Sequence, residues 1–349
     1  MLLVLLAVAV VGLVLQITLG GVVRVTGSGD GCPDWPRCFG RWYPPFEYHA
    51  ILEYSHRTVG SLVGLVIIAA TAMVWIKHRD DRVVAWLATT CLALIVVVGG
   101  IGGAVVLNEL DPAIRTLHLM LAEIVALLAV LALVAATHAR PGSKHEFNHA
   151  TRNATFDGTP GKGTPWIWGE VSDEHRSALN LAAVATLLTL VALLSGSYAV
   201  WREAGGVCAS WPLCGGSIIP ESGLAWVHMT HRVLSLVSIV AVLFAGHRAW
   251  RLPNVSRALR AAALGSAVLI VAQMLMGAAN PWTTFAEWAR AGHLSMATLV
   301  WVDMVFIVAL LLRPVPRKEL SGPGREQVRE QTGGAPVAPG PAWREARPE

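Results

Sequence analysis

Two short polar motifs stand at the mouths of long apolar stretches of this sequence. Residues 53–57 read EYSHR, and residues 228–232, which lie 175 positions later, read HMTHR. A histidine beside an arginine is costly to place at the edge of a membrane helix, and such polar groups usually mark a functional site. The two copies differ at one informative position, because Glu53 in the first is His228 in the second.

The motif histidines, His56 and His231, each have a partner further along the chain. His118 and His293 are also 175 positions apart, and each lies near the start of an apolar stretch. Two imidazoles that face each other inside a helical bundle can bind a haem iron from both sides. The sequence therefore predicts two haem sites, one between His56 and His118 and one between His231 and His293.

Four arginines accompany these histidines. Arg57 and Arg232 directly follow a histidine, whereas Arg115 and Arg290 precede one by three positions, about one turn of a helix. Haem carries two anionic propionates, and guanidinium groups suit carboxylates. We therefore expect these four arginines to bind haem propionates near the outer face of a membrane.

The histidines are also compatible with roles that need no haem. An intramembrane histidine can serve as a hydrogen-bond partner between helices. A zinc site is less favoured, because zinc takes four ligands and each histidine pair supplies two. The agreement of pairing, depth and repetition favours haem.

Glu53 lies three positions before His56, on the same face of a predicted helix. A carboxylate beside an iron site can relay protons or hold a group of the substrate. A rim glutamate that faces water would have neither role, and the sequence is compatible with both interpretations. Two further acids, Glu123 and Asp303, lie deeper in apolar stretches and do not match each other in the repeat. A proton path or interhelical bonding is the only role that the sequence suggests for them.

The cysteines form two equivalent pairs around a Trp-Pro dipeptide, Cys32 with Cys38 and Cys208 with Cys214. Paired cysteines on the oxidising outer side of a bacterial membrane favour disulfides. Each disulfide would close a small loop beside a predicted iron site, either as a fixed staple or as a redox-active pair. Cys91 lies in an apolar stretch, where we expect a buried packing residue.

The composition indicates which elements must position these residues. Of the 349 residues, 54% are hydrophobic and 14% are charged, whereas about 25% are charged in a soluble domain. About 20 apolar residues span a bilayer as a helix. The stretches of that length are 2–22, 54–76, 83–107, 114–137, 178–200, 225–248, 258–280 and 290–312. They are continuous rather than alternating, so the sequence predicts an all-α integral membrane protein and excludes a β-barrel.

The repeat relates the first four predicted helices to the last four. Offsets of 175 or 176 align the cysteines, the Trp-Pro dipeptides, the His-Arg pairs and the later histidines. Because each half has four helices, the two halves have the same orientation and form a parallel repeat. We expect tandem four-helix bundles at 1–137 and 178–313, a polar cytoplasmic linker at 138–177 and a disordered cytoplasmic tail at 314–349.

The basic residues predict the orientation in the membrane. If the N-terminus is cytoplasmic, the cytoplasmic segments hold 15 Lys or Arg residues and the outer segments hold 6, in agreement with the positive-inside rule. Both termini are then cytoplasmic. His56 lies about three residues into its predicted helix and His118 about five, so both are at a similar depth near the outer face. The net charge of +4 reflects these loops and does not indicate nucleic-acid binding.

Together these motifs resemble the haem A synthase family over all eight predicted helices. That family makes haem a for terminal oxidase assembly, by oxidising the C8 methyl group of haem o to a formyl group in two successive hydroxylations. The resemblance implies that Glu53 is the catalytic carboxylate. It also implies that the first half binds haem o between His56 and His118, and that the second half binds a resident haem b between His231 and His293.

The resemblance carries further expectations. The Cys32–Cys38 pair matches that of many bacterial members, and Cys208–Cys214 matches only some. A multi-pass protein of the bacterial plasma membrane is implied. Haem o synthase and cytochrome oxidase assembly factors are candidate partners, and the sequence does not identify the electron donor.

Two other classes of protein would use the same histidines. A quinol-linked electron-transfer cytochrome with two haems b would need all four but would not need Glu53. A transporter with parallel repeats would use them as proton relays. The bound haems separate the three: haem o or haem a beside haem b indicates the synthase, haem b alone leaves the cytochrome open, and no haem favours the transporter.

Overall fold

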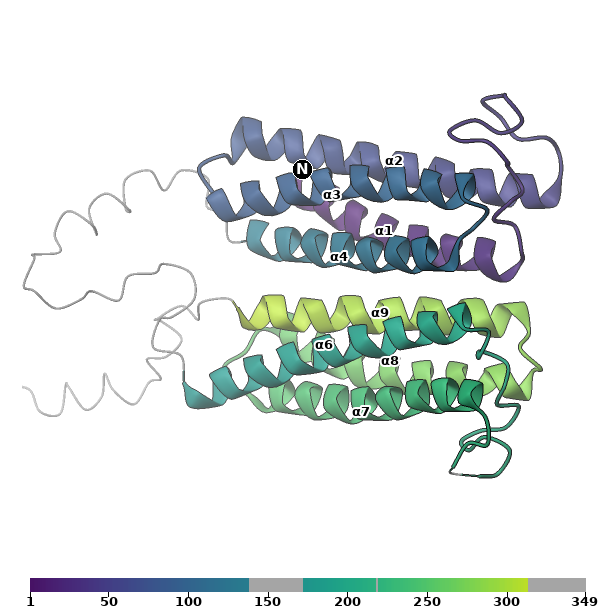
Figure 1. Ribbon diagram of the computed structural model, residues 1–349. Coiled ribbons are helices and arrows are strands. Elements are labelled where there is room, and N and C mark those ends of the chain that lie inside the picture. Colours follow the sequence, from purple (N-terminus) through teal and green to yellow (C-terminus); the bar gives the residue numbers. More distant parts are fainter. Residues whose placement is uncertain (138–171, 218, 313–349) are drawn as a thin grey trace, which may run out of the picture. The chain divides into compact units, whose positions relative to one another are not determined.

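The computed structural model describes residues 1–137, 172–217 and 219–312, and this part of the chain forms eight α-helices (Figure 1). Each helix is long and apolar enough to cross a membrane. The prediction of an all-α membrane protein with eight spanning helices is therefore confirmed. The tail at 314–349 and most of the predicted linker lie outside the described residues.

The helices of the first half are α1 (Leu2–Val25), α2 (Tyr48–Lys77), α3 (Arg82–Leu107) and α4 (Pro112–Ala136). Those of the second half are α6 (Asp173–Trp201), α7 (Gly223–Arg251), α8 (Arg257–Trp282) and α9 (Glu287–Leu311).

All of the described helices except α1 begin earlier than the apolar stretches predict. The side chain of Glu47 accepts hydrogen bonds from the backbone N–H groups of His49 and Ala50 and caps α2, which begins at Tyr48, six residues before the predicted start at 54. The hydroxyl of Ser172 caps α6 in the same way, with Asp173 and Glu174 in the first turn. The predicted linker at 138–177 is therefore too long at its end. The first turns of these helices are polar, so the apolar stretches begin several residues after the helices themselves.

The contacts between helices follow the repeat. In each half the four helices contact one another in sequence order, and the first also contacts the fourth. Helices α1, α4, α6 and α9 join the halves, through contacts of α9 with α1 and α4 and of α4 with α6. The cysteine loops that follow α1 and α6 lie at the same end of the helices (Figure 1).

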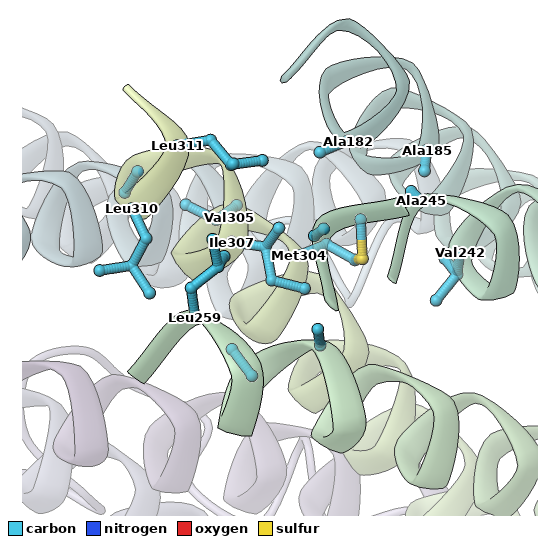
Figure 2. Close-up of a cluster of buried hydrophobic side chains, with 14 of the residues drawn as sticks. Ala182, Ala185, Val242, Ala245, Leu259, Met304, Val305, Ile307, Leu310 and Leu311 are labelled. Carbon is cyan, nitrogen blue, oxygen red and sulfur yellow. The ribbon is translucent and has the colours of Figure 1, made fainter. Parts of the chain in front are cut away.

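The largest buried cluster packs α9 against its neighbours in the second half and also includes Val130 and Val134 of α4 (Figure 2). Met304, Ile307 and Leu311 of α9 are almost fully buried, beside small residues such as Ala182 on α6 and Ala245 on α7. Small side chains let helix backbones approach closely, and close packing is a main source of helix association in lipid. The first half has two separate clusters of the same kind.

A buried polar contact crosses between the halves. Glu123 of α4 is fully buried, and its Oε1 accepts a hydrogen bond of 2.7 Å from the hydroxyl of Thr298 on α9. The indole of Trp301 donates to the backbone carbonyl of Glu123 at 3.0 Å. The structure therefore supports the interhelical role for Glu123 that the sequence left open.

Candidate functional site

All four predicted histidines lie at the interior of their own half. His56 follows the first residue of α2 by eight positions, and His231 has the same place in α7. His118 and His293 each follow the first residue of α4 or α9 by six positions. The histidines are thus deeper in their helices than the apolar stretches predicted, and their depths remain matched.

Each histidine packs against a glycine of a neighbouring helix. The pairs are Gly20 with His56, Gly102 with His118, Gly196 with His231 and Gly277 with His293. A Cβ atom at these glycines would stand 2.9–3.1 Å from the ring carbon Cε1, closer than side chains normally pack. The glycines therefore form cradles that set the position of each imidazole.

The second half shows how the two rings of a pair face each other. The ring centres of His231 and His293 are 6.3 Å apart, and the ring planes cross at 85°. A metal–imidazole bond is about 2 Å long, so one metal ion between two rings separates the bound nitrogens by about 4 Å and the ring centres by more. The spacing of His231 and His293 is compatible with one metal ion between them.

Three of the four rings have a buried nitrogen without a hydrogen-bond partner among the described residues. Nδ1 of His56, His118 and His293 is buried and has no hydrogen-bond partner. An unpaired buried polar group is costly, and a native structure usually retains one for a function. Among the described residues, no three His, Cys, Asp or Glu side chains cluster as a metal site. Two imidazoles per half suit a haem, which supplies its own four equatorial ligands, better than zinc.

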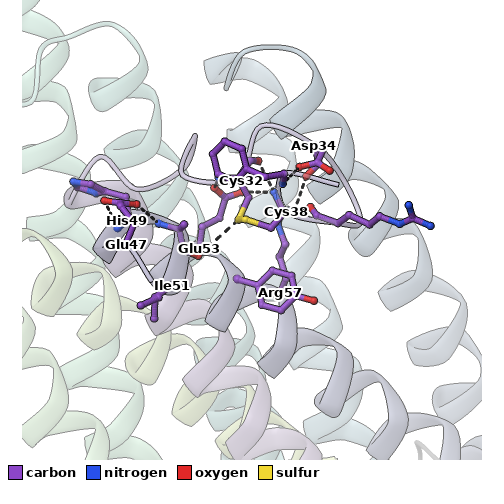
Figure 3. Close-up of a disulfide and its surroundings, with 12 residues drawn as sticks. Cys32, Asp34, Cys38, Glu47, His49, Ile51, Glu53 and Arg57 are labelled. Atoms are coloured by element: carbon purple, nitrogen blue, oxygen red, sulfur yellow. Dashed lines mark hydrogen bonds and ion pairs between the residues drawn. A yellow bond between two sulfur atoms is a disulfide. The ribbon is translucent and has the colours of Figure 1, made fainter. Parts of the chain in front are cut away.

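Glu53 is buried rather than exposed at a rim. It is 3% exposed, because α2 starts at Tyr48 and the loop after α1 folds over it. Its Oε2 accepts a hydrogen bond of 2.7 Å from the backbone N–H of Cys32, and its Oε1 forms an ion pair with Arg57 (Figure 3). The interpretation as a solvated rim glutamate is therefore wrong.

The equivalent position in the second half has different chemistry. His228 is linked through Nδ1 to the backbone carbonyl of Ala204 at 2.8 Å. No carboxylate pairs with Arg232 among the described residues, whereas Arg57 pairs with Glu53. The halves therefore differ in charge at this point, as the sequence indicated.

Both cysteine pairs are disulfides, Cys32–Cys38 and Cys208–Cys214. Each loop holds a cis Trp-Pro peptide bond and is fastened to its half by the arginine of the motif. Arg57 donates to the backbone carbonyls of Cys32, Asp34 and Arg37, and Arg232 donates to those of Cys208 and Pro212. These two arginines thus have loop partners that the sequence did not predict, and their contact with propionates stays a prediction.

Asp34 organises the first loop. Its carboxylate accepts hydrogen bonds from the backbone N–H groups of Gly40 and Phe39. These bonds, above all that of Gly40, hold the pKa of Asp34 below its ordinary value. The equivalent residue of the second loop is Ser210, whose hydroxyl accepts a hydrogen bond from the backbone N–H of Gly215.

Arg115 and Arg290 belong to a cationic cluster between the halves. Both act electrostatically on Arg24, in the last turn of α1. Arg290 donates to the backbone carbonyl of Val25 at 3.0 Å, and the Nε atoms of Arg24 and Arg115 are buried without partners. Three positive charges, two of them with an unpaired donor, are suited to an anion such as a carboxylate.

Sequence reasoning missed the four glycines, Arg24 and the two arginine clasps. The glycines had a usable signal, because Gly20 and Gly196 share the offset of 176 and Gly102 and Gly277 share the offset of 175. Arg24 had none, since Val200 takes its place in the second half.

The sequence matches known proteins along most of its length. It matches the family COX15-CtaA, described as cytochrome oxidase assembly protein, over residues 3–51 and 45–305. A Heme A synthase of Symbiobacterium thermophilum is 28% identical over 311 residues, which are 88% of this chain and 94% of the relative. Heme A synthases of Alkalihalophilus pseudofirmus and Shouchella clausii are 27% and 28% identical, over 87% and 86% of this chain and 95% and 94% of the relatives. These relatives favour the synthase over the cytochrome and the transporter.

Proposed function

Because the chain belongs to the COX15-CtaA family of cytochrome oxidase assembly proteins, we propose that its halves divide the work of a haem A synthase between a substrate site and a cofactor site. The activity is an oxidation that converts haem o to haem a for cytochrome oxidase assembly. The protein is a multi-pass membrane protein.

The first half is the substrate site in this proposal. His56 and His118 hold haem o from its two sides, each ring positioned by its glycine. Support comes from the matched depth of the two rings and from the glycines that position them. Arg115, with its buried and unpaired Nε, is the better placed arginine for a propionate, because Arg57 already donates to the first loop.

Glu53 is the catalytic carboxylate of the proposal. Two hydroxylations of a methyl group give a hydrated aldehyde, and loss of water from it leaves the formyl group, so protons must be moved at the reacting carbon. A buried carboxylate can accept and return a proton at its oxygens. The Cys32 N–H and the Arg57 guanidinium fix the position of Glu53 and balance its charge.

The second half is the cofactor site. His231 and His293 would hold haem b, and Arg232 and Arg290 are the candidate propionate partners. Haem b supplies one-electron chemistry when bound. The spacing of the two rings supports this assignment, and so does the replacement of the carboxylate by His228.

The proposal also covers location and partners. The positive-inside rule supports a bacterial plasma membrane protein with both termini in the cytoplasm, so the disulfide loops face outward. Haem o synthase is the candidate source of substrate, and oxidase assembly factors are the candidate recipients of haem a.

The observation that carries the proposal is the buried Glu53 of the first half, at the position where the second half has His228. Glu53→Gln keeps size and hydrogen-bonding capacity but removes charge and basicity. Loss of a general acid–base group costs about 10²–10⁴-fold in rate. We expect this variant to fold, to keep haem b and to accumulate haem o or a partly oxidised haem.

The measurement is haem extraction and chromatography from cells that also make haem o. His228→Gln is the matched control and should keep haem a formation near the wild-type level. A wild-type yield of haem a from Glu53→Gln would refute the catalytic role.

A further inference from the structure

The first helix of each half presents a different polar side chain to the histidine that it cradles. In the first half this side chain is Gln16 of α1. Its Nε2 donates to the backbone carbonyl of His56 at 3.0 Å and lies 3.3 Å from the ring nitrogen Nε2 of the same residue. A carbonyl oxygen only accepts hydrogen bonds, so the group that faces His56 is the –NH₂ of the amide.

The amide therefore donates a hydrogen bond to the lone pair on Nε2 of the His56 ring. An –NH₂ group has two hydrogens, and the carbonyl of His56 takes one of them. The other points to Nε2 of the ring, which must then be an acceptor. An iron ion would need the same lone pair. Among the described residues, the amide oxygen of Gln16 is buried without a partner, so the side chain is held only through its –NH₂ group.

The second half leaves the equivalent nitrogen free. The residue equivalent to Gln16 is Ala192, which has no polar side chain. The polar side chain that contacts His231 is instead that of Ser195. Its Oγ donates to the backbone carbonyl of Ala192 at 2.7 Å and lies 2.9 Å from Nδ1 of His231. With its own hydrogen used, the hydroxyl oxygen accepts from Nδ1–H. This tautomer leaves Nε2 of His231 unprotonated and available to a metal.

The surroundings of Gln16 are also specific to the first half. A Cβ atom at Gly60 of α2 would stand 2.8 Å from Nε2 of Gln16, so the glycine makes room for the amide. Ser235 is the equivalent of Gly60 in the second half. The pair of Gln16 and Gly60 thus occurs at one site and is replaced at the other.

We propose that Gln16 competes with haem iron for Nε2 of His56 and so makes the first site exchangeable, whereas Ser195 commits His231 to permanent haem binding. The inference rests on the proposed function, in which a substrate must enter and a product must leave the first half. A resident cofactor has no such need. Gln16 is a positioning residue in this scheme, since it acts through His56.

Haem release from the purified, detergent-solubilised protein tests the proposal. Excess apomyoglobin takes up released haem, and pyridine haemochrome spectra distinguish haem b from haem o and haem a. In Gln16→Leu, which removes the amide at similar volume, release of haem o or haem a should slow by about two- to tenfold, as the loss of one competing hydrogen bond implies. Release of haem b should not change.

Two further variants keep the test decisive. Gln16→Ala copies the residue of the second half and should act in the same direction as Gln16→Leu. Ser195→Ala should instead speed the release of haem b and leave the first site unchanged. Retention of haem b in the Gln16 variants reports that they are folded.

The outcomes separate this proposal from the proposed function. Measurable binding of haem o or haem a, with unchanged or faster release in both Gln16 variants, overturns the role of Gln16 alone. A wild-type protein from haem o-producing cells that holds only haem b overturns the proposed function, and with it this proposal.

Discussion

The outer ends of the two halves are built alike and charged differently. In both, an arginine from the second helix clasps a disulfide loop by its backbone carbonyls. In the first half the same arginine also pairs with Glu53, which accepts from the backbone N–H of Cys32. In the second half, His228 takes the place of Glu53 and turns to the carbonyl of Ala204. The two halves thus share a frame and differ in the charge of the side chain at this position.

The largest effect expected from this comparison is on the resident haem. His231→Ala or His293→Ala removes one of the two facing rings, and the purified protein should lose most of its haem b. His56→Ala is the matched variant of the other half and should keep haem b. Absorption spectra and haem extraction measure both. Wild-type haem b content in both second-half variants would show that the assignment of the halves is wrong.

The disulfide loops should differ in their effect on activity. Replacing Cys32 and Cys38 by serine frees the segment whose N–H group holds Glu53. A buried hydrogen bond to a charged group is worth about 1.5–3 kcal/mol, so haem a formation should fall by roughly ten- to hundredfold. The same change at Cys208 and Cys214 touches no carboxylate and should have a smaller effect. Equal losses from the two double variants would contradict this difference.

Two buried threonine hydroxyls should differ in what they contribute to the stability of the protein. Thr298→Val removes the donor to Glu123 and leaves a buried carboxylate with neither oxygen paired, which costs about 1–3 kcal/mol. Thermal unfolding in detergent measures the loss. Thr186→Val is the control, because that buried hydroxyl bonds only within its own helix, to the carbonyl of Ala182. A control as destabilising as Thr298→Val would mean that the link between the halves contributes nothing.

The smallest effect concerns pH and the first loop. The pKa of Asp34 is lowered by the N–H groups of Gly40 and Phe39. The ionised carboxylate of Asp34 therefore stabilises the folded loop fully above the ordinary carboxyl pKa. This stabilisation is lost as the pH falls through the lowered pKa. Amide exchange of Phe39 and Gly40 should speed up below about pH 3.8, relative to the intrinsic rate. Gly215, which is held by the neutral Ser210, should show no such change.

The sequence was sufficient for the helices and the histidines because both leave strong, repeated patterns. Eight apolar stretches and two matched offsets predicted the fold and the four rings. The burial of Glu53 was beyond reach, since it depends on the polar turn that Glu47 caps and on a loop that folds back over α2. A hydropathy pattern reports apolar side chains and does not detect the polar residue that caps the start of a helix.

Contacts between helices that are distant in the sequence could not be predicted either. Gln16 is an ordinary polar residue in an apolar stretch until α1 and α2 are placed side by side, and the cluster of Arg24, Arg115 and Arg290 needs three helices from two halves. The repeat predicts which residues are equivalent. It does not predict which of them meet, because that depends on packing between the halves.

Glu123 and Thr298 are the same position of the repeat, 175 residues apart, and they touch each other. In a symmetric pair of identical chains, a residue that lies on the twofold axis meets its own copy. Two buried glutamates would repel there, and two threonines would offer no carboxylate. A fused chain can place an acid on one side of the axis and a hydroxyl on the other, which no homodimer of a single sequence can do. Fusion thereby makes the axis itself a place where the two halves can diverge.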